Sequence, residues 1–209
     1  MKIIDISWPI SAATTGYKDK NVVAFTQVKS FSKDNAFETH LTLSSHSGTH
    51  VDAPLHFLKD GLTIDEIKLD RLIGMATVLD LTMCPEAIGY DELKIHESRI
   101  NAGDIILLKT ANSLKLATEK FTPHFVYLHA SGADYLASKK VKAVGIDYLG
   151  IERDQPGHET HVTLFNHDIV IIEGLRLDPV VPGRYEFYCL PLYCIGVEAA
   201  PARAILIER

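Results

Sequence analysis

The sequence has few cysteines, no dense basic cluster and no long apolar run. Cys84, Cys189 and Cys194 are odd in number and lack the spacing of paired metal ligands, so we expect reduced, mostly buried thiols. Lys139 and Lys140 form the densest basic cluster, and the formal net charge is -6. This charge distribution argues against a nucleic acid or an anionic membrane as partner.

The first residues also lack an apolar stretch long enough for a signal peptide or a membrane helix, because an acid occurs at position 5. We therefore expect a cytoplasmic protein. With 46% hydrophobic and 23% charged residues, the composition is that of a globular protein and excludes disorder and fibrous repeats. No internal repeat or Ser/Gly-rich linker divides the chain, which predicts one domain over residues 1–209.

The order of the expected elements predicts an α/β fold. Helix-length stretches at residues 112–120 and 131–140 are each followed by a β-type run, and Ser131 is a plausible N-cap. The early strands come without intervening helices, so we expect a mixed sheet whose antiparallel part precedes the alternating part. The β-type runs are residues 3–7, 37–43, 76–81, 105–108, 125–128, 143–146, 169–172 and 204–207.

Histidine, in contrast, is abundant, and several of the ten histidines lie close together in residues 46–56. Glycine, β-branched residues and a proline within this stretch oppose a helix, so we expect an extended or irregular backbone. Because side chains alternate in an extended chain, His46, His50, Asp52 and His56 would share one side, with Gly48 leaving its centre open.

Imidazole nitrogens and a carboxylate oxygen on one side suit Zn²⁺, or with lower preference Mn²⁺ or Fe²⁺. The alternative is that these histidines are exposed or hydrogen-bonded near an edge strand, which is the usual state of a single histidine. Three histidines and an aspartate of the same parity favour the metal site.

A second candidate cluster lies near residues 158–165. If Thr160 caps a short helix there, Leu164 and Phe165 face the core and tie the helix end that carries His161 to the interior. His158 is expected to be solvated.

Glu173 follows the apolar run 169–172. A carboxylate at the end of such a strand lies where open α/β sheets present functional groups. A solvated charge at the strand end is the alternative.

The run from His46 to His56, His-Ser-Gly-Thr-His-Val-Asp-Ala-Pro-Leu-His, resembles the H-x-G-T-H-x-D-x-P-x-H signature of the cyclase-like metal-dependent hydrolases. This family includes bacterial kynurenine formamidase and isatin hydrolase. The resemblance continues through residues 145–147, His161 and residues 173–175. It implies a single α/β domain of the swivelling β/β/α type, with a mixed, barrel-like β-sheet flanked by helices, assembled as a homodimer.

The resemblance also implies roles for individual residues. His56 would be the acid/base residue, and Asp52 would bridge two ions. The ligands of one or two Zn²⁺ ions, with Mn²⁺ as an alternative, would be His46, His50, Asp52, His161 and Glu173.

The activity implied by the resemblance is hydrolysis of an amide on an aromatic ring, foremost of N-formylkynurenine to kynurenine and formate in tryptophan catabolism. Ring opening of a cyclic amide, as in isatin hydrolase, is the close alternative, and a non-catalytic metal-stabilised binding protein is an alternative of another class. Trp8, Phe25, Phe37 or Phe57 could wall an aromatic substrate, although aromatic residues more often belong to the core.

Overall fold

The structure is a computed structural model that describes residues 1–20 and 22–209. Its helices are α1 (Phe31–Asp34), α2 (Tyr90–Lys94), α3 (Ala130–Ser138) and α4 (Glu159–Asn166). Its strands are β1 (Lys2–Asp5), β2 (Ala24–Lys29), β3 (Glu38–Thr42), β4 (His50–Asp52), β5 (Ile73–Asp80), β6 (Ala87–Ile88), β7 (Ile105–Lys109), β8 (Tyr127–Leu128), β9 (Ala143–Ile146), β10 (Val170–Glu173), β11 (Arg184–Pro191) and β12 (Ala199–Glu208).

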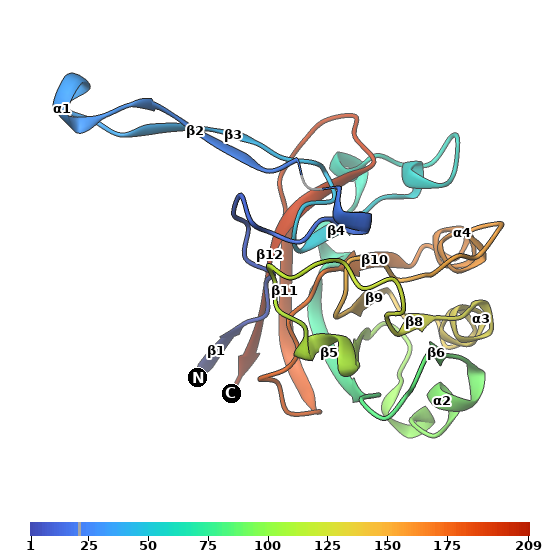
Figure 1. The fold of residues 1–209 in the computed structure, drawn as a ribbon. Coiled ribbons are helices and arrows are strands. Elements are labelled where there is room, and N and C mark those ends of the chain that lie inside the picture. The colour runs from blue at the N-terminus through green and yellow to red at the C-terminus, as the bar shows by residue number, and fades with distance from the viewer. Residues whose placement is uncertain (21) are drawn as a thin grey trace.

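The main sheet closes into a barrel. Strands follow the order β12-β11-β5-β7-β9-β10-β4, and the ring is closed because β4 pairs with both β10 and β12. The neighbours from β5 to β10 are parallel, whereas β4, β11 and β12 pair antiparallel to their neighbours. β1 pairs with β12, which brings the two chain ends together (Figure 1). The α/β class and the mixed, barrel-like sheet are therefore as expected, but the antiparallel part does not simply precede the alternating part, because β11 and β12 follow the parallel strands in the chain.

Both faces of the parallel strands are buried. In β7, Ile105 and Leu107 face the barrel interior, while Ile106 and Leu108 pack in a second core against helices α3 and α4. Figure 1 shows α2, α3 and α4 along one side of the barrel. Burial on two faces explains why these strands are continuous apolar runs rather than alternating ones.

The antiparallel hairpin β2–β3 projects from the barrel as an arm, with α1 at its tip (Figure 1). Every residue of both strands is exposed, and Phe25 lies opposite Leu41. The run at residues 37–43 is thus a strand as expected, although it contributes nothing to the core.

Three local expectations differ from the structure. Residues 112–120 form a short 3-10 turn, Ala111–Leu114, and then a loop, because the buried Asn112 side chain bonds the backbone of Val126 instead of facing solvent on a helix. The run at residues 125–128 is a strand only at its last two residues. Ser131 lies inside α3, whose N-cap is His129: its ring accepts a hydrogen bond from the Ser131 N–H.

All three cysteines are free, with Cys84 and Cys189 buried and Cys194 partly so. Cys189 belongs to β11, whose apolar side chains Tyr185 and Phe187 also face the core. In the part of the chain that the structure describes, no helix has the length and apolarity to cross a membrane.

Candidate metal centre

Two neighbouring strands carry the buried centre of the site. His50 and Asp52 lie two residues apart on β4, so their side chains share one face, and β10 places Glu173 directly opposite His50. All three are nearly inaccessible to solvent. His50 Nε2 lies 3.3 Å from Glu173 Oε2 and 3.5 Å from Asp52 Oδ1. The expected extended backbone, and not a helix, brings this pair together.

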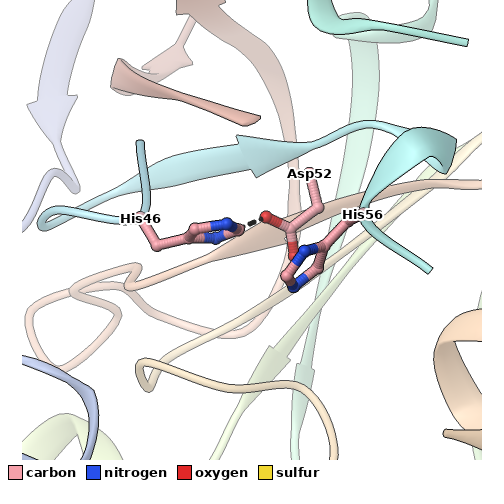
Figure 2. Close-up of side chains that lie close together, drawn as sticks. All are labelled: His46, Asp52 and His56. Carbon is pink, nitrogen blue, oxygen red and sulfur yellow. Dashed lines mark ion pairs between the residues drawn. The ribbon is translucent and has the colours of Figure 1, made fainter. Parts of the chain in front are cut away.

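His46 and His56 flank this strand and point toward Asp52 (Figure 2). His46 Nδ1 lies 3.1 Å from Asp52 Oδ1, and the ring centroids of His46 and His56 are 4.4 Å apart. One nitrogen of each ring and an Asp52 oxygen lie within 4.8 Å of one another. The four residues thus share a site as expected, but parity accounts only for His50 and Asp52 on β4: His46 lies in the turn before this strand, and His56 ends the 3-10 turn Pro54–His56.

Helix α4 adds His161 from the other side. His161 Nε2 lies 3.7 Å from Asp52 Oδ2 and 3.5 Å from Glu173 Oε1. Leu164 and Phe165 anchor the helix in the core as expected, but α4 begins after His158 rather than after Thr160. Thr160 instead bonds the Leu128 carbonyl and Gln155.

The five predicted ligand residues are thus brought together, and their polar atoms fit a cation. His50 Nε2 and both Asp52 carboxylate oxygens are buried without a hydrogen-bond partner among the described residues. Unpaired buried polar atoms cost about 1–3 kcal/mol each, and a divalent ion would satisfy all three. The His50 Nδ1–H donates to the Gly48 carbonyl at 2.9 Å, which directs the Nε2 lone pair toward the carboxylates.

The charges of the site are strongly coupled. Burial alone would lower the pKa of His50, but Asp52 and Glu173 outweigh it and raise that pKa to about 9. Burial opposes ionisation of Asp52 as well, yet His161 and His46 hold the pKa of Asp52 well below its usual range. The centre without an ion is therefore a cluster of imidazolium and carboxylate groups.

Glu152 was missed in the sequence. It is buried, its Oε2 lies 3.0 Å from His161 Nδ1, and its other oxygen pairs with His158 Nδ1. The available signal was its place after β9, because functional groups gather at the carboxyl ends of parallel strands. His158 is half-exposed, as expected for a solvated histidine, but it is paired.

A cavity of about 390 Å³ opens beside the cluster. This volume is within the range of small-molecule sites. Of the aromatic candidates only Phe57 lines it: Trp8 packs in the core against Tyr148, and Phe25 and Phe37 lie on the arm. The cavity wall also includes Thr14, Thr15, Tyr17, His46, His50, His56, Leu149, Glu152, His158, His161 and Glu173.

Tyr17 is the other aromatic residue of this wall, and it too was missed, because it lies in a loop without periodicity. Burial, together with Glu173 and Glu152, raises the pKa of Tyr17. Its hydroxyl is therefore protonated at neutral pH and available as a donor to a ligand.

Comparison with known proteins identifies the family of this chain. The family model described as "Putative cyclase" matches residues 4–153. The chain belongs to the cyclase family. Among curated members, the kynurenine formamidase of Salinibacter ruber is 34% identical over 99% of this chain and 97% of its own, and that of Bacillus mycoides is 31% identical over 97% and 96%.

Solved structures agree with the family assignment. A potential metal-dependent hydrolase with cyclase activity has a TM-score of 0.89 and 39% identity, covering 100% of this chain and 98% of that chain. An isatin hydrolase bound to the product analogue thioisatinate has a TM-score of 0.88 at 22% identity, covering 100% and 93%. The similarity to the isatin hydrolase, at this sequence identity, shows a shared fold.

Proposed function

We propose that this cyclase-family protein is a metal-dependent amidohydrolase that acts on an aromatic amide, foremost as an arylformamidase that converts N-formylkynurenine to kynurenine and formate. The observation that carries the proposal is the convergence of three histidines and two carboxylates, with unpartnered buried atoms, on the end of a cavity lined by Tyr17 and Phe57. The full-length similarity to kynurenine formamidases supports the choice of substrate.

We propose His46, His50, Asp52, His161 and Glu173 as ligands of one or two Zn²⁺ ions, with Mn²⁺ as the alternative. A divalent ion held by these residues would lower the pKa of water toward neutrality and would polarise the amide carbonyl. Asp52 has one oxygen near His46 and His50 and the other near His161, which suits a bridging carboxylate. The proposed ligands lie far apart in the sequence, from His46 to Glu173. We therefore propose that residues 1–209 form one functional domain.

We assign His56 to proton transfer. Its ring lies between those of His46 and Phe57 at the cavity wall, and in the described residues no hydrogen bond fixes its nitrogens. It takes a proton from the attacking water and returns it to the amide nitrogen as the C–N bond breaks. Without that proton the aniline nitrogen is a poor leaving group, and such transfer contributes typically 10²- to 10⁴-fold in rate.

The alternatives make different demands on the site. A metal-stabilised binding protein would fill every coordination position with protein, whereas here a cavity adjoins the ligands. Opening of a cyclic amide needs the same site as formamide hydrolysis, so only turnover separates the two substrates.

We further propose a homodimer held by the arm. A two-stranded hairpin is marginally stable in water by itself, yet this one exposes Phe25, Phe31, Phe37 and Leu41. A second copy of the chain would cover these side chains. Residues 185–192 are also apolar for a segment that faces solvent: Tyr185, Phe187 and Cys189 face the core, whereas Leu190 and Leu192 are exposed. The cytoplasmic location stays a prediction from the sequence.

The test is metal analysis of the purified protein combined with spectrophotometric assays of N-formylkynurenine and isatin. We expect at least one equivalent of a divalent metal and faster turnover of the formamide. A metal-loaded protein that hydrolyses neither substrate would refute the proposal.

A further inference from the structure

Two lysines line the mouth of the metal-site cavity. Lys18 belongs to the 3-10 turn Tyr17–Asp19, and Lys20 directly follows it. Both side chains contribute to the same cavity wall as His46 and Glu173. They come from a loop that supplies none of the proposed ligands, so their presence requires a separate explanation.

The charges of the two lysines are not neutralised within the described part of the chain. Neither lysine has a carboxylate within ion-pair distance there, and Lys18 Nζ lies 5.3 Å from the ring centroid of Tyr17. Asp19, between them, is engaged elsewhere, because its Oδ1 accepts a hydrogen bond from the Phe121 N–H at 2.8 Å. The mouth of the cavity is therefore cationic.

The carboxylates deeper in the cavity do not account for the lysines either. Asp52 and Glu173 pair with His50 and His161, and Glu152 pairs with His158 and His161. An ammonium group near the proposed cations would moreover repel them. Two unpaired ammonium groups at a cavity mouth favour the binding of a molecule that carries an anionic group.

We infer that Lys18 and Lys20 bind a carboxylate of the substrate, remote from the amide that is hydrolysed. The inference rests on the proposed function and narrows its substrate class to aromatic amides that carry a carboxylate. The reacting amide then lies at the histidine cluster, the ring lies along the wall that Tyr17 and Phe57 form, and the carboxylate stays at the mouth.

The size of the effect follows from the exposure of the two lysines. Ion pairs at exposed positions contribute modestly and are screened by salt, so we expect about a two- to fivefold change in substrate selectivity per lysine. The double variant should therefore change selectivity by roughly four- to twenty-fivefold at low ionic strength, and less in concentrated salt.

The experiment compares N-formylkynurenine with its decarboxylated analogue, which keeps the formamide and the ring. The ratio of the two kcat/KM values is measured for the wild type, for Lys18→Met/Lys20→Met and for Lys18→Arg/Lys20→Arg. Lys140→Met is the matched control, because Lys140 is also exposed, has a φ of 56° against 52° for Lys18, and lies outside the cavity. Calorimetric titration of both compounds gives the ratio of their affinities independently of turnover.

We expect the wild type to prefer the substrate that carries the carboxylate. The methionine variant should lose that preference through a higher KM for this substrate, whereas the arginine variant and Lys140→Met should keep it. An equal ratio in the wild type and the methionine variant, or an equal loss toward both compounds, would overturn the inference. If the wild type turns over neither compound, the proposed function fails and the affinity ratio still decides the carboxylate site. Absence of binding of both compounds overturns both proposals.

Discussion

His56 and Asp52 lie in one cluster, but their truncation has different expected consequences. His56→Ala should retain the metal and lose about 10²- to 10⁴-fold in kcat, because it removes a proton-transferring group and no proposed ligand. Asp52→Ala should lose both metal and activity, because it removes the carboxylate at the centre of the ligand set. Metal content and kcat of both variants are the quantities to measure.

The same two variants also decide whether His56 is a metal ligand or a proton-transferring residue, because the geometry allows both roles. A His56 nitrogen lies within 4.8 Å of the ligand atoms of His46 and Asp52, close enough for a shared ion. If His56→Ala is metal-free, His56 is a ligand. If the variant is loaded and fully active, proton transfer belongs to another group, and His158 on the same cavity wall is the next candidate.

We expect Glu152 to affect metal binding through His161, whose Nδ1 lies 3.0 Å from its Oε2. Glu152→Gln should weaken metal binding by roughly 10- to 100-fold, because the carboxylate that orients the His161 ring and makes it more basic is lost. Glu159→Gln is the control, since Glu159 is an exposed acid on α4, the helix that carries His161. Titration with a chromophoric chelator measures the affinity, and equal affinities of the two variants would refute the positioning role.

The ion pairs of the metal-free centre predict how it responds to pH. The pKa of His50 is raised to about 9 and that of His161 well above its usual 6.5, each by neighbouring carboxylates that outweigh burial. Both rings must lose a proton to bind metal, so metal affinity should rise with pH toward 9. The protonated rings stabilise the metal-free fold below pH 6.5, and this contribution is lost as the pH rises through 9.

Thermal unfolding of the chelator-treated protein between pH 6.5 and 9 measures this contribution directly, with the metal-loaded protein as reference. The metal-free protein should lose stability across that range, and the loaded protein should lose less. Parallel curves for the two forms would contradict the assignment of the raised pKa values.

At the scale of elements, the end of β10 depends on one glycine. Gly174 has φ +68°, and a Cβ there would lie 2.4 Å from the carbonyl oxygen of Gly48, the acceptor that orients His50. Gly174→Ala should therefore cost about 3–5 kcal/mol and weaken metal binding, because strain and overlap add. Gly103→Ala is the matched control: with φ +79° and nothing within 4 Å, it should cost about 1 kcal/mol and leave metal binding unchanged.

Chemical denaturation and metal titration of both alanine variants separate these effects. Similar losses in the two variants would show that the conformation of Gly174, rather than the contact with Gly48, determines its cost.

The strands that the sequence predicted are those whose burial or side-chain alternation leaves a local pattern in the sequence. β7, β9 and β10 are buried on both faces and therefore appear as apolar runs, and β4 has a parity that collects His50 and Asp52 on one face. A barrel-like sheet was expected only from the family resemblance, and its closure through β4 and β12 could not be predicted from the residues themselves, because pairing between strands distant in sequence leaves no local pattern.

The residues of the site divide in the same way. His46, His50 and Asp52 have regular spacing and Glu173 ends a strand, whereas His161, on α4, was assigned as a ligand only through the family resemblance. Tyr17 and the two lysines of the mouth lie in loops, where only the three-dimensional structure shows what they face, and the only sequence signal for Glu152 was its place after β9. For the same reason Trp8 could be placed in the core rather than at the substrate only from the structure.

At the scale of the whole molecule, the arm predicts the state of assembly. Phe25→Ser/Leu41→Ser should weaken association at least tenfold, because it removes a cross-strand apolar pair from the proposed interface. Met83→Ser is the control, since Met83 is 92% exposed and lies between β5 and β6 rather than on the arm. Light scattering over a concentration series measures the association, and a wild type that is monomeric and fully active at assay concentrations would refute the dimer.

The pairing of β12 with β4 has a consequence for synthesis on the ribosome. β4 carries His50 and Asp52, and of its two edges one is covered by β10 and the other only by residues 199–201. A nascent chain can therefore complete the wall that holds these ligands only after β12 has left the exit tunnel. Until then the histidine segment, which is made before β12, stays open to solvent along that edge, so metal capture should follow the emergence of β12.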